Sequence, residues 1–256
     1  MSDLAKRSLS GVILIAVAAA ALWAGGIAFW VLTSIAALLM MAEWSELHGS
    51  DAKTKRVGQF AISVPLAIMC PLAAGPTFLA LGMIAGAAFF VAAITRRSGL
   101  GWGAIYIGLP VLALLALRFY PDGGFLLTFW AMALVWATDI GAYFAGRTIG
   151  GPKIAPTISP KKTWAGLVGG VIAATGFAFV LHVWAGLPFR LVMWTPLLAC
   201  VAQAGDFYES WLKRRAGVKD SGSLLPGHGG VLDRLDGLVP VAPIAAILVE
   251  VPRWLT

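Results

Sequence analysis

Long apolar runs, separated by short polar or glycine-rich turns, cover most of the chain. Nine such runs can be marked, at about residues 9–25, 27–47, 58–74, 77–94, 102–120, 124–145, 164–187, 191–212 and 236–252. An α-helix needs roughly 17 to 25 predominantly apolar residues to cross the hydrocarbon core of a bilayer. The pattern therefore predicts an all-α, polytopic membrane protein with about nine transmembrane helices. No internal repeat or second domain interrupts it, so residues 1–256 are expected to form a single transmembrane domain.

The composition supports this interpretation and excludes several others. Of the 256 residues, 59% are hydrophobic and only 12% are charged, about half the charge that a soluble domain typically carries. The net charge of +7 could suggest nucleic acid, but the cations punctuate apolar runs instead of forming a stripe, so we expect no nucleic-acid partner. The two cysteines, Cys70 and Cys200, lie in apolar runs without metal-ligand spacing, which argues against a zinc site or a disulfide.

The positions of the basic residues predict the orientation. If the N-terminus is cytoplasmic, sixteen of the nineteen lysines and arginines fall on the inner side, and only Arg118, Arg190 and Arg253 fall at outer ends. Loops rich in lysine and arginine resist translocation, so the C-terminus is expected outside a multi-pass protein of the inner membrane. The basic start followed by an apolar run also fits a signal peptide, but a second run follows at once and favours a retained first helix.

Glycines spaced four residues apart predict close contacts between helices. Gly82 with Gly86, and Gly166 with Gly170, would each let two helix backbones approach closely within a membrane. Near the inner end of the second run, Glu43 and Glu46 are interpreted as solvated caps.

Polar chemistry gathers in two segments that share the predicted inner side. The first, residues 138–166, carries Asp139, Arg147, Lys153, Lys161 and Lys162. Its cations at headgroup depth would bind anionic lipid, nucleotide phosphate or both. The second, residues 205–237, is denser in charged and small residues: Asp206, Glu209, Ser210, Lys213, Arg214, Lys219, Asp220, His228, Gly229, Gly230, Asp233, Arg234 and Asp236.

These residue types favour a site for a polyphosphate and a hard cation. Ionisable residues within membrane helices are costly and usually functional. Magnesium prefers carboxylate oxygens, while glycine backbone N–H groups and cationic side chains bind phosphate oxygens. No serine–histidine–carboxylate arrangement with a nucleophile elbow is present, which argues against acyl transfer. His228, in a glycine turn, fits a structural hydrogen bond as well as a catalytic role.

The stretch "SWLKRRAGVKDSGSLLPGHGGVLDRLD", residues 210–236, resembles the signature of phosphatidate cytidylyltransferases, also called CDP-diacylglycerol synthases. The upstream stretches "TDIGAYFAGRTIGG" and "ISPKKTWAG" are similar to a second region of that family. The resemblance covers about residues 138–237, which we take as the signature and active-site region. One departure is Ala165, where the family usually carries a glutamate before the glycine.

The resemblance implies that CTP and phosphatidic acid condense to CDP-diacylglycerol and pyrophosphate, with magnesium as cofactor. A second, monovalent cation and a homodimer are left open. The residues that would act in catalysis are Asp206, Ser210, Lys219, Asp220 and Asp233. Those that would bind substrate are Lys161, Lys162, Lys213, Arg214, His228, Gly229, Gly230 and Arg234. Those that would hold magnesium are Asp206 and Asp233, with Asp220, Asp236 and Asp139 nearby.

Two rival functions predict different features. A transporter or lipid flippase with a carboxylate proton relay would place acidic residues near the bilayer midplane and break helices in paired halves. Here the carboxylates cluster at one end instead. A CDP-alcohol transferase would carry an Asp-Gly, Ala-Arg, Gly, Asp, Asp pattern that the chain lacks.

Overall fold

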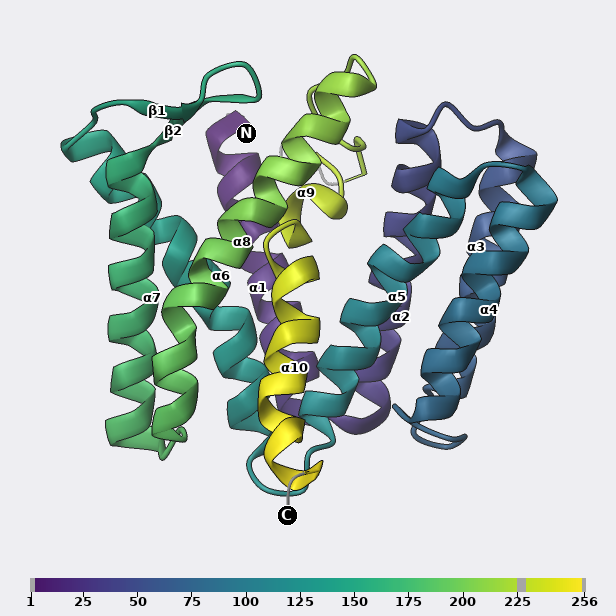
Figure 1. The fold of residues 1–256 in the computed structure, drawn as a ribbon, viewed down its shortest axis with the longest axis horizontal. Helices are drawn as coiled ribbons and strands as arrows, with labels where there is room; N and C mark the ends of the chain where they lie inside the picture. The colour runs from purple at the N-terminus through teal and green to yellow at the C-terminus, as the bar shows by residue number, and fades with distance from the viewer. Residues whose placement is uncertain (1–2, 225–228, 255–256) are drawn as a thin grey trace.

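The computed structural model describes residues 3–224 and 229–254 and shows a bundle of long helices (Figure 1). Its helices are α1 (Asp3–Ala24), α2 (Gly26–Leu47), α3 (Ala52–Ile68), α4 (Phe78–Thr95), α5 (Ser98–Arg118), α6 (Gly124–Thr148), α7 (Trp164–Ala185), α8 (Phe189–Arg215), α9 (Leu232–Leu235) and α10 (Leu238–Trp254). Each predicted apolar run overlaps with one long helix. The four-residue α9 is additional.

Five of these helices are long and apolar enough to cross a membrane, counting only the part of the chain that the structure describes. They are α2, α4, α5, α6 and α7, and two shorter apolar helices cover Gly11–Ala24 and Leu238–Val251. The structure therefore supports a largely helical, multi-pass membrane protein.

The third helix lies about six residues before its predicted place, at Ala52–Ile68 and not 58–74. The carboxylate of Asp51 accepts a hydrogen bond from the backbone N–H of Thr54 at 3.0 Å, which caps the helix at a polar sequence. Hydropathy detects the apolar part of a helix but not a polar first turn. The same effect lengthens α6 and α8 beyond their apolar runs at their polar ends.

A short β-hairpin, which the apolar pattern did not predict, follows α6. Strands β1 (Lys153–Ala155) and β2 (Ser159–Thr163) pair antiparallel, with Lys153 opposite Thr163 and Ala155 opposite Ser159. The hydroxyl of Thr163 then accepts a hydrogen bond from the N–H of Gly166 at 3.0 Å and caps α7. The hairpin thus holds the cations of the first polar segment at the start of α7.

Small residues set the spacing between α6 and α7. A Cβ at Gly170 would lie 2.8 Å from the carbonyl oxygen of Thr138, and one at Gly166 would lie 3.0 Å from that of Ala142. The predicted close contact is confirmed for this glycine pair. For Gly82 and Gly86 of α4 it is wrong within the residues that the structure describes, because none of their atoms lies within 4 Å of a Cβ at either position.

The helices form two groups joined at the centre. In Figure 1, α6, α7 and α8 lie on one side, α2 to α5 on the other, and α1 and α10 between them. The core of buried side chains includes Trp44, Trp130, Phe29 and Leu134. The start of α1, the hairpin, α9 and the last turn of α8 share one end, which we call the signature end, and α10 finishes at the opposite end (Figure 1).

Candidate active site

The two polar segments of the sequence meet at the signature end. The Nζ atom of Lys162, on β2, lies 2.5 Å from Oδ2 of Asp206, on α8. The same ammonium lies 4.5 Å from the centroid of the Phe207 ring. Ser210, one turn along α8, donates a hydrogen bond to the other oxygen of Asp206 at 3.3 Å. Segments that are more than forty positions apart in the chain therefore share one site.

Two further carboxylates border this ion pair. Asp236, between α9 and α10, interacts electrostatically with Asp206 and with Asp139 of α6. Burial raises the pKa of Asp236 to about 7, and the neighbouring charges of Asp206 and Asp139 add to the shift. Three carboxylates therefore lie around Lys162, and Arg234 is a second cation that interacts electrostatically with Asp139. A cation or a proton would relieve their repulsion.

Lys213 organises a second, more buried group of charges. Its Nζ lies 2.6 Å from Oδ1 of Asp233 and 3.2 Å from Oε1 of Glu209, and all three side chains are at most 12% exposed. Both oxygens of Glu209 lack a hydrogen-bond partner among the described residues. Asp236 also interacts electrostatically with Glu209, so the two charge groups are adjacent.

Asp233 accepts hydrogen bonds at both carboxylate oxygens. Besides Lys213, it accepts from the N–H of Gly230 at 2.7 Å, the N–H of Ser221 at 2.9 Å and the hydroxyl of Ser221 at 3.0 Å. Burial alone would raise the pKa of Asp233, but these donors outweigh it and hold the pKa below its usual value. Asp233 is therefore stabilised in its ionised form and holds Ser221 and Gly230 in place.

Gly229 and Gly230 lack side chains, so carboxylates can lie close to their backbone. Gly229 has a φ of +80°, and a Cβ there would lie 2.5 Å from Oδ2 of Asp233. The N–H of Gly230 donates to Asp233, so in this structure it does not point freely at a phosphate. The sequence predicted that these glycines contact phosphate, and in this structure they also accommodate acidic side chains of the protein itself.

Glu43, which the sequence suggested was a solvated cap, is buried instead, and that interpretation was wrong. Its residue is 5% exposed, and its carboxylate accepts from the Ser221 hydroxyl and from the N–H groups of Val231 and Leu232. Nearby Glu46 does behave as expected, since it pairs with Lys55 near the surface at 2.7 Å. In the sequence, the one sign that Glu43 could have a special role was its place as an acidic residue at the end of an apolar run. The sequence does not reveal which residues it contacts.

The remaining predicted site residues lie at the surface of the signature end. Exposed positions carry the side chains of Lys161, Arg214, Lys219, Asp220 and Arg234. Asp220 packs near Gly229, within 3.4 Å of a Cβ placed there. His228 falls outside the described residues.

The donor chemistry of the site fits magnesium. No three histidine, cysteine or acidic side chains lie close enough together to form a complete metal site anywhere in residues 3–224 and 229–254. Magnesium, however, usually takes one or two protein carboxylates and completes its shell with water and substrate phosphates. The repulsion between Asp206 and Asp236 is the situation that a bound cation relieves, and Glu209, whose ion-pair partner is the Lys213 ammonium at 3.2 Å, lies beside them.

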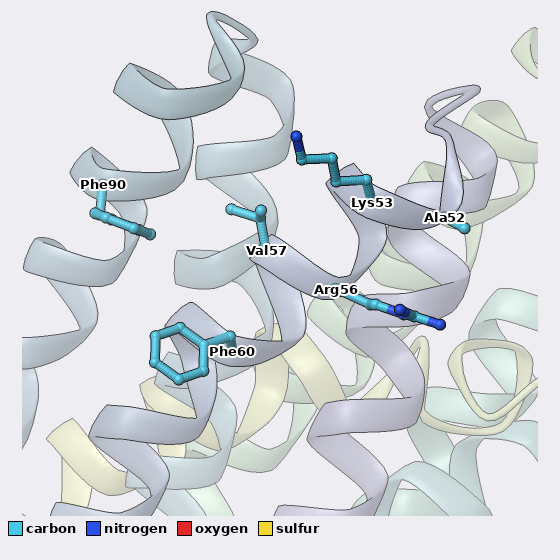
Figure 2. A pocket seen from close by; sticks show the side chains of 6 residues that line it. All are labelled: Ala52, Lys53, Arg56, Val57, Phe60 and Phe90. Carbon is cyan, nitrogen blue, oxygen red and sulfur yellow. The ribbon is translucent and has the colours of Figure 1, made fainter.

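The hollow shown in Figure 2 is a different feature. It measures about 510 Å³ and is lined by residues of α3 and α4, namely Ala52, Lys53, Arg56, Val57, Phe60 and Phe90. No carboxylate lines it, so it lacks the groups that a magnesium–polyphosphate substrate requires. The candidate site is therefore the charge network at the signature end.

Comparison with known proteins identifies relatives over nearly the whole chain. Residues 5–251 match the model of the cytidylyltransferase family. A phosphatidate cytidylyltransferase of Brucella melitensis is 40% identical over 95% of this chain and 92% of its own length. Proteins of the same name from Pseudomonas aeruginosa and Rickettsia bellii are 33% and 30% identical, over 83% and 95% of this chain and 84% and 89% of their own lengths.

Proposed function

The chain belongs to the cytidylyltransferase family, and we propose that it is the enzyme that transfers the cytidylyl group of CTP to phosphatidic acid. The products are CDP-diacylglycerol and pyrophosphate. The family, the names of relatives that align along nearly the full chain and the apolar helices all support this activity and a membrane lipid environment.

One observation supports the proposal most strongly, the ion pair between Lys162 and Asp206. It joins the hairpin after α6 to the end of α8, so cations from one polar segment and carboxylates from the other line the same site. Two polyanionic substrates repel each other, and binding them together requires positive charge from more than one direction. Lys161, next to Lys162 on β2, and Arg234, on α9, are exposed cations suited to the phosphates.

The proposed reaction does not require a strong general base. A phosphatidate oxygen is already ionised near neutral pH and can attack the α-phosphorus of CTP. The bond between that phosphorus and the oxygen bridging to the β-phosphate breaks, and pyrophosphate leaves. Lys162 and Lys213 would exchange carboxylate partners for phosphate oxygens and so orient the two substrates. Ser210 would donate to a phosphate oxygen in place of Asp206.

Magnesium would be held by Asp206 together with Asp236 or Asp233, the carboxylates of α8 and the α9 region. When bound, it would neutralise charge on the triphosphate and stabilise the departing pyrophosphate. Asp139 and Asp220 would support that set from α6 and from the loop. The carboxylates would bind it in their ionised forms, which ties metal affinity to the protonation of Asp236.

We propose further that the signature end faces the cytoplasm. Nine spans with a cytoplasmic N-terminus would place sixteen of the nineteen basic residues on that side of an inner membrane. A lipid headgroup and a water-soluble nucleotide can meet only at this depth. Arg118 is predicted at the opposite end of the bundle. Its side chain donates a hydrogen bond to the carbonyl oxygen of Leu22, near the end of α1, at 3.0 Å, which supports a structural role away from the signature end.

The experiment that tests the function supplies purified protein with phosphatidic acid, magnesium and one nucleoside triphosphate at a time. Mass spectrometry of the lipid fraction should reveal CDP-diacylglycerol when CTP is present and no nucleotidyl lipid with ATP, GTP or UTP. An unchanged lipid fraction under all four conditions would contradict the proposal. Movement of phosphatidic acid across liposomes lacking CTP would instead favour a transporter.

A further inference from the structure

Glu43 has a buried carboxyl group without a cationic partner among the described residues. It lies in the last turns of α2, with 5% of its surface exposed, and no salt bridge in those residues includes it. Its carboxylate instead accepts the Ser221 hydroxyl at 3.0 Å and the N–H groups of Val231 and Leu232, both at 2.8 Å. These partners follow it by 178 to 189 positions in the chain.

Such a carboxylate is a strong anchor. Hydrogen bonds to an ionised oxygen are shorter and stronger than neutral ones. An ionised carboxylate in a buried place is costly unless donors surround it, so the loop and the side chain stabilise each other. The two backbone donors open α9, which carries Asp233. Glu43 therefore connects the N-terminal half of the bundle to the acidic end of the signature.

Two glycines of the signature make room for this anchor. A Cβ at Gly222 would lie 3.0 Å from Oε1 of Glu43, and one at Gly230 would lie 2.5 Å from Oε2 and would also collide with the Ser221 hydroxyl. Any side chain at Gly230 would push the carboxylate away from α9. Glycine is therefore needed at these two positions because the Glu43 side chain, from the distant helix α2, occupies the space beside them.

Ser221 connects Glu43 to the charged group of Asp233 and Lys213. The Ser221 hydroxyl lies 3.0 Å from Glu43 Oε2 and 3.0 Å from Asp233 Oδ2, and Asp233 in turn holds Lys213 at 2.6 Å. One hydroxyl proton serves two carboxylates, so the positions of Glu43 and Asp233 depend on each other. A shift of Glu43 would move Asp233 and, through it, the ammonium of Lys213.

We propose that Glu43 is a positioning residue for nucleotidyl transfer: it fixes Ser221 and the start of α9, and so sets where Asp233 and Lys213 meet the substrates. The proposal rests on the proposed function. Glu43 itself touches neither substrate. Its effect is on the geometry of the reacting groups, to which rates are sensitive on the scale of an ångström.

The test compares Glu43→Gln with Glu46→Gln in the full-length protein, in detergent or nanodiscs. Both changes remove one charge from α2 and keep a good helix former, but Glu46 is exposed and, within the described residues, its one ion pair is with Lys55 near the surface. Glu43→Gln leaves one α9 N–H facing an amide N–H₂ group. We expect kcat to fall about 10- to 100-fold, as for supporting residues of metal sites. KM for phosphatidic acid should change by no more than about twofold, since the lost interaction acts on the reacting geometry.

Hydrogen exchange supplies a readout that does not depend on activity. In Glu43→Gln, peptides covering residues 229–236 should exchange about tenfold faster, while peptides of α6 and α7 stay unchanged. Glu46→Gln should match the wild type in both measurements. Ser221→Ala keeps both N–H donors to Glu43, so it should show a smaller fall in kcat and a smaller increase in exchange at residues 229–236. This variant replaces Glu43→Gln in the test if Glu43→Gln does not fold.

The outcomes separate the two proposals. Wild-type exchange at residues 229–236, or normal kcat, in a folded Glu43→Gln protein overturns the positioning role. So does an equal loss of kcat in Glu46→Gln. If the wild-type protein itself makes no CDP-diacylglycerol, the proposed function fails, while the exchange experiment still reports on the anchor.

Discussion

Replacing Lys213 by methionine should destabilise the protein strongly. Methionine keeps the length of the side chain but removes the charge that faces Asp233 at 2.6 Å and Glu209 at 3.2 Å. The side chains of the three residues are 12%, 4% and 1% exposed, respectively, so water cannot replace the lost partner. Breaking a buried pair from one side typically costs about 3–5 kcal/mol, because it leaves an uncompensated charge.

The matched control is Lys55→Met. Lys55 and Glu46 lie 2.7 Å apart, almost the same distance, but their side chains are 32% and 52% exposed. An exposed pair is worth about 0–1 kcal/mol. The two substitutions therefore remove the same group at the same distance and differ in burial.

The assay is unfolding in detergent at a fixed scan rate, followed by the fluorescence of the eleven tryptophans. For a chain of this size, about 1 kcal/mol shifts the midpoint by roughly 2–4 °C, so Lys213→Met should lose about 6–20 °C and Lys55→Met no more than about 4 °C. Adding Asp233→Asn to Lys213→Met should recover part of the loss. Equal midpoints for Lys213→Met and Lys55→Met would show that burial does not make the Lys213 ion pairs more important for stability than the exposed pair.

Three further predictions concern acidity, packing and catalysis. Burial raises the pKa of Asp236 in the folded protein to about 7, well above that of an aspartate in the unfolded chain. Asp236 therefore stabilises the fold at low pH, and this stabilisation is lost as pH rises through about 7. The magnesium-free midpoint should therefore be higher at pH 5.5 than at pH 8, less so in Asp236→Asn, and activity should fall as pH drops below about 7. A Cβ at Gly170 would meet the carbonyl of Thr138, so Gly170→Ala should lower the midpoint, whereas Gly86→Ala, with open space around it, should leave it equal or higher. Asp233→Asn should abolish incorporation of labelled CTP into lipid while the protein stays extractable, and near-normal activity would remove Asp233 from the site.

The helices could be predicted from sequence because the membrane imposes a simple rule. A backbone in hydrocarbon must satisfy its own hydrogen bonds, so each long apolar run becomes a helix. Where polar residues extend a helix, as in α3 after Asp51, the rule gives the wrong ends. The strands of the β1–β2 hairpin have only three and five residues in a polar segment, so they leave no signal in the hydropathy pattern.

The chemistry of the site was visible in the sequence, but its connections were not. Residue type and spacing suggested Asp206 and Asp233 for a charged site, and the two belong to adjacent groups in the structure. That Lys162 would pair with Asp206 depends on how α6 and α7 pack against α8, which no local pattern records. Glu43 is the clearest case, because its three donors lie more than 170 positions away.

The measurement that tests the account most directly follows a label from CTP. Purified protein, phosphatidic acid and magnesium are supplied with CTP labelled either at the α-phosphorus or at the γ-phosphorus. We expect the α-label to enter the lipid, the γ-label to stay in water as pyrophosphate, and Asp206→Asn to transfer neither. A γ-label in the lipid, or undiminished transfer by Asp206→Asn, would contradict the account.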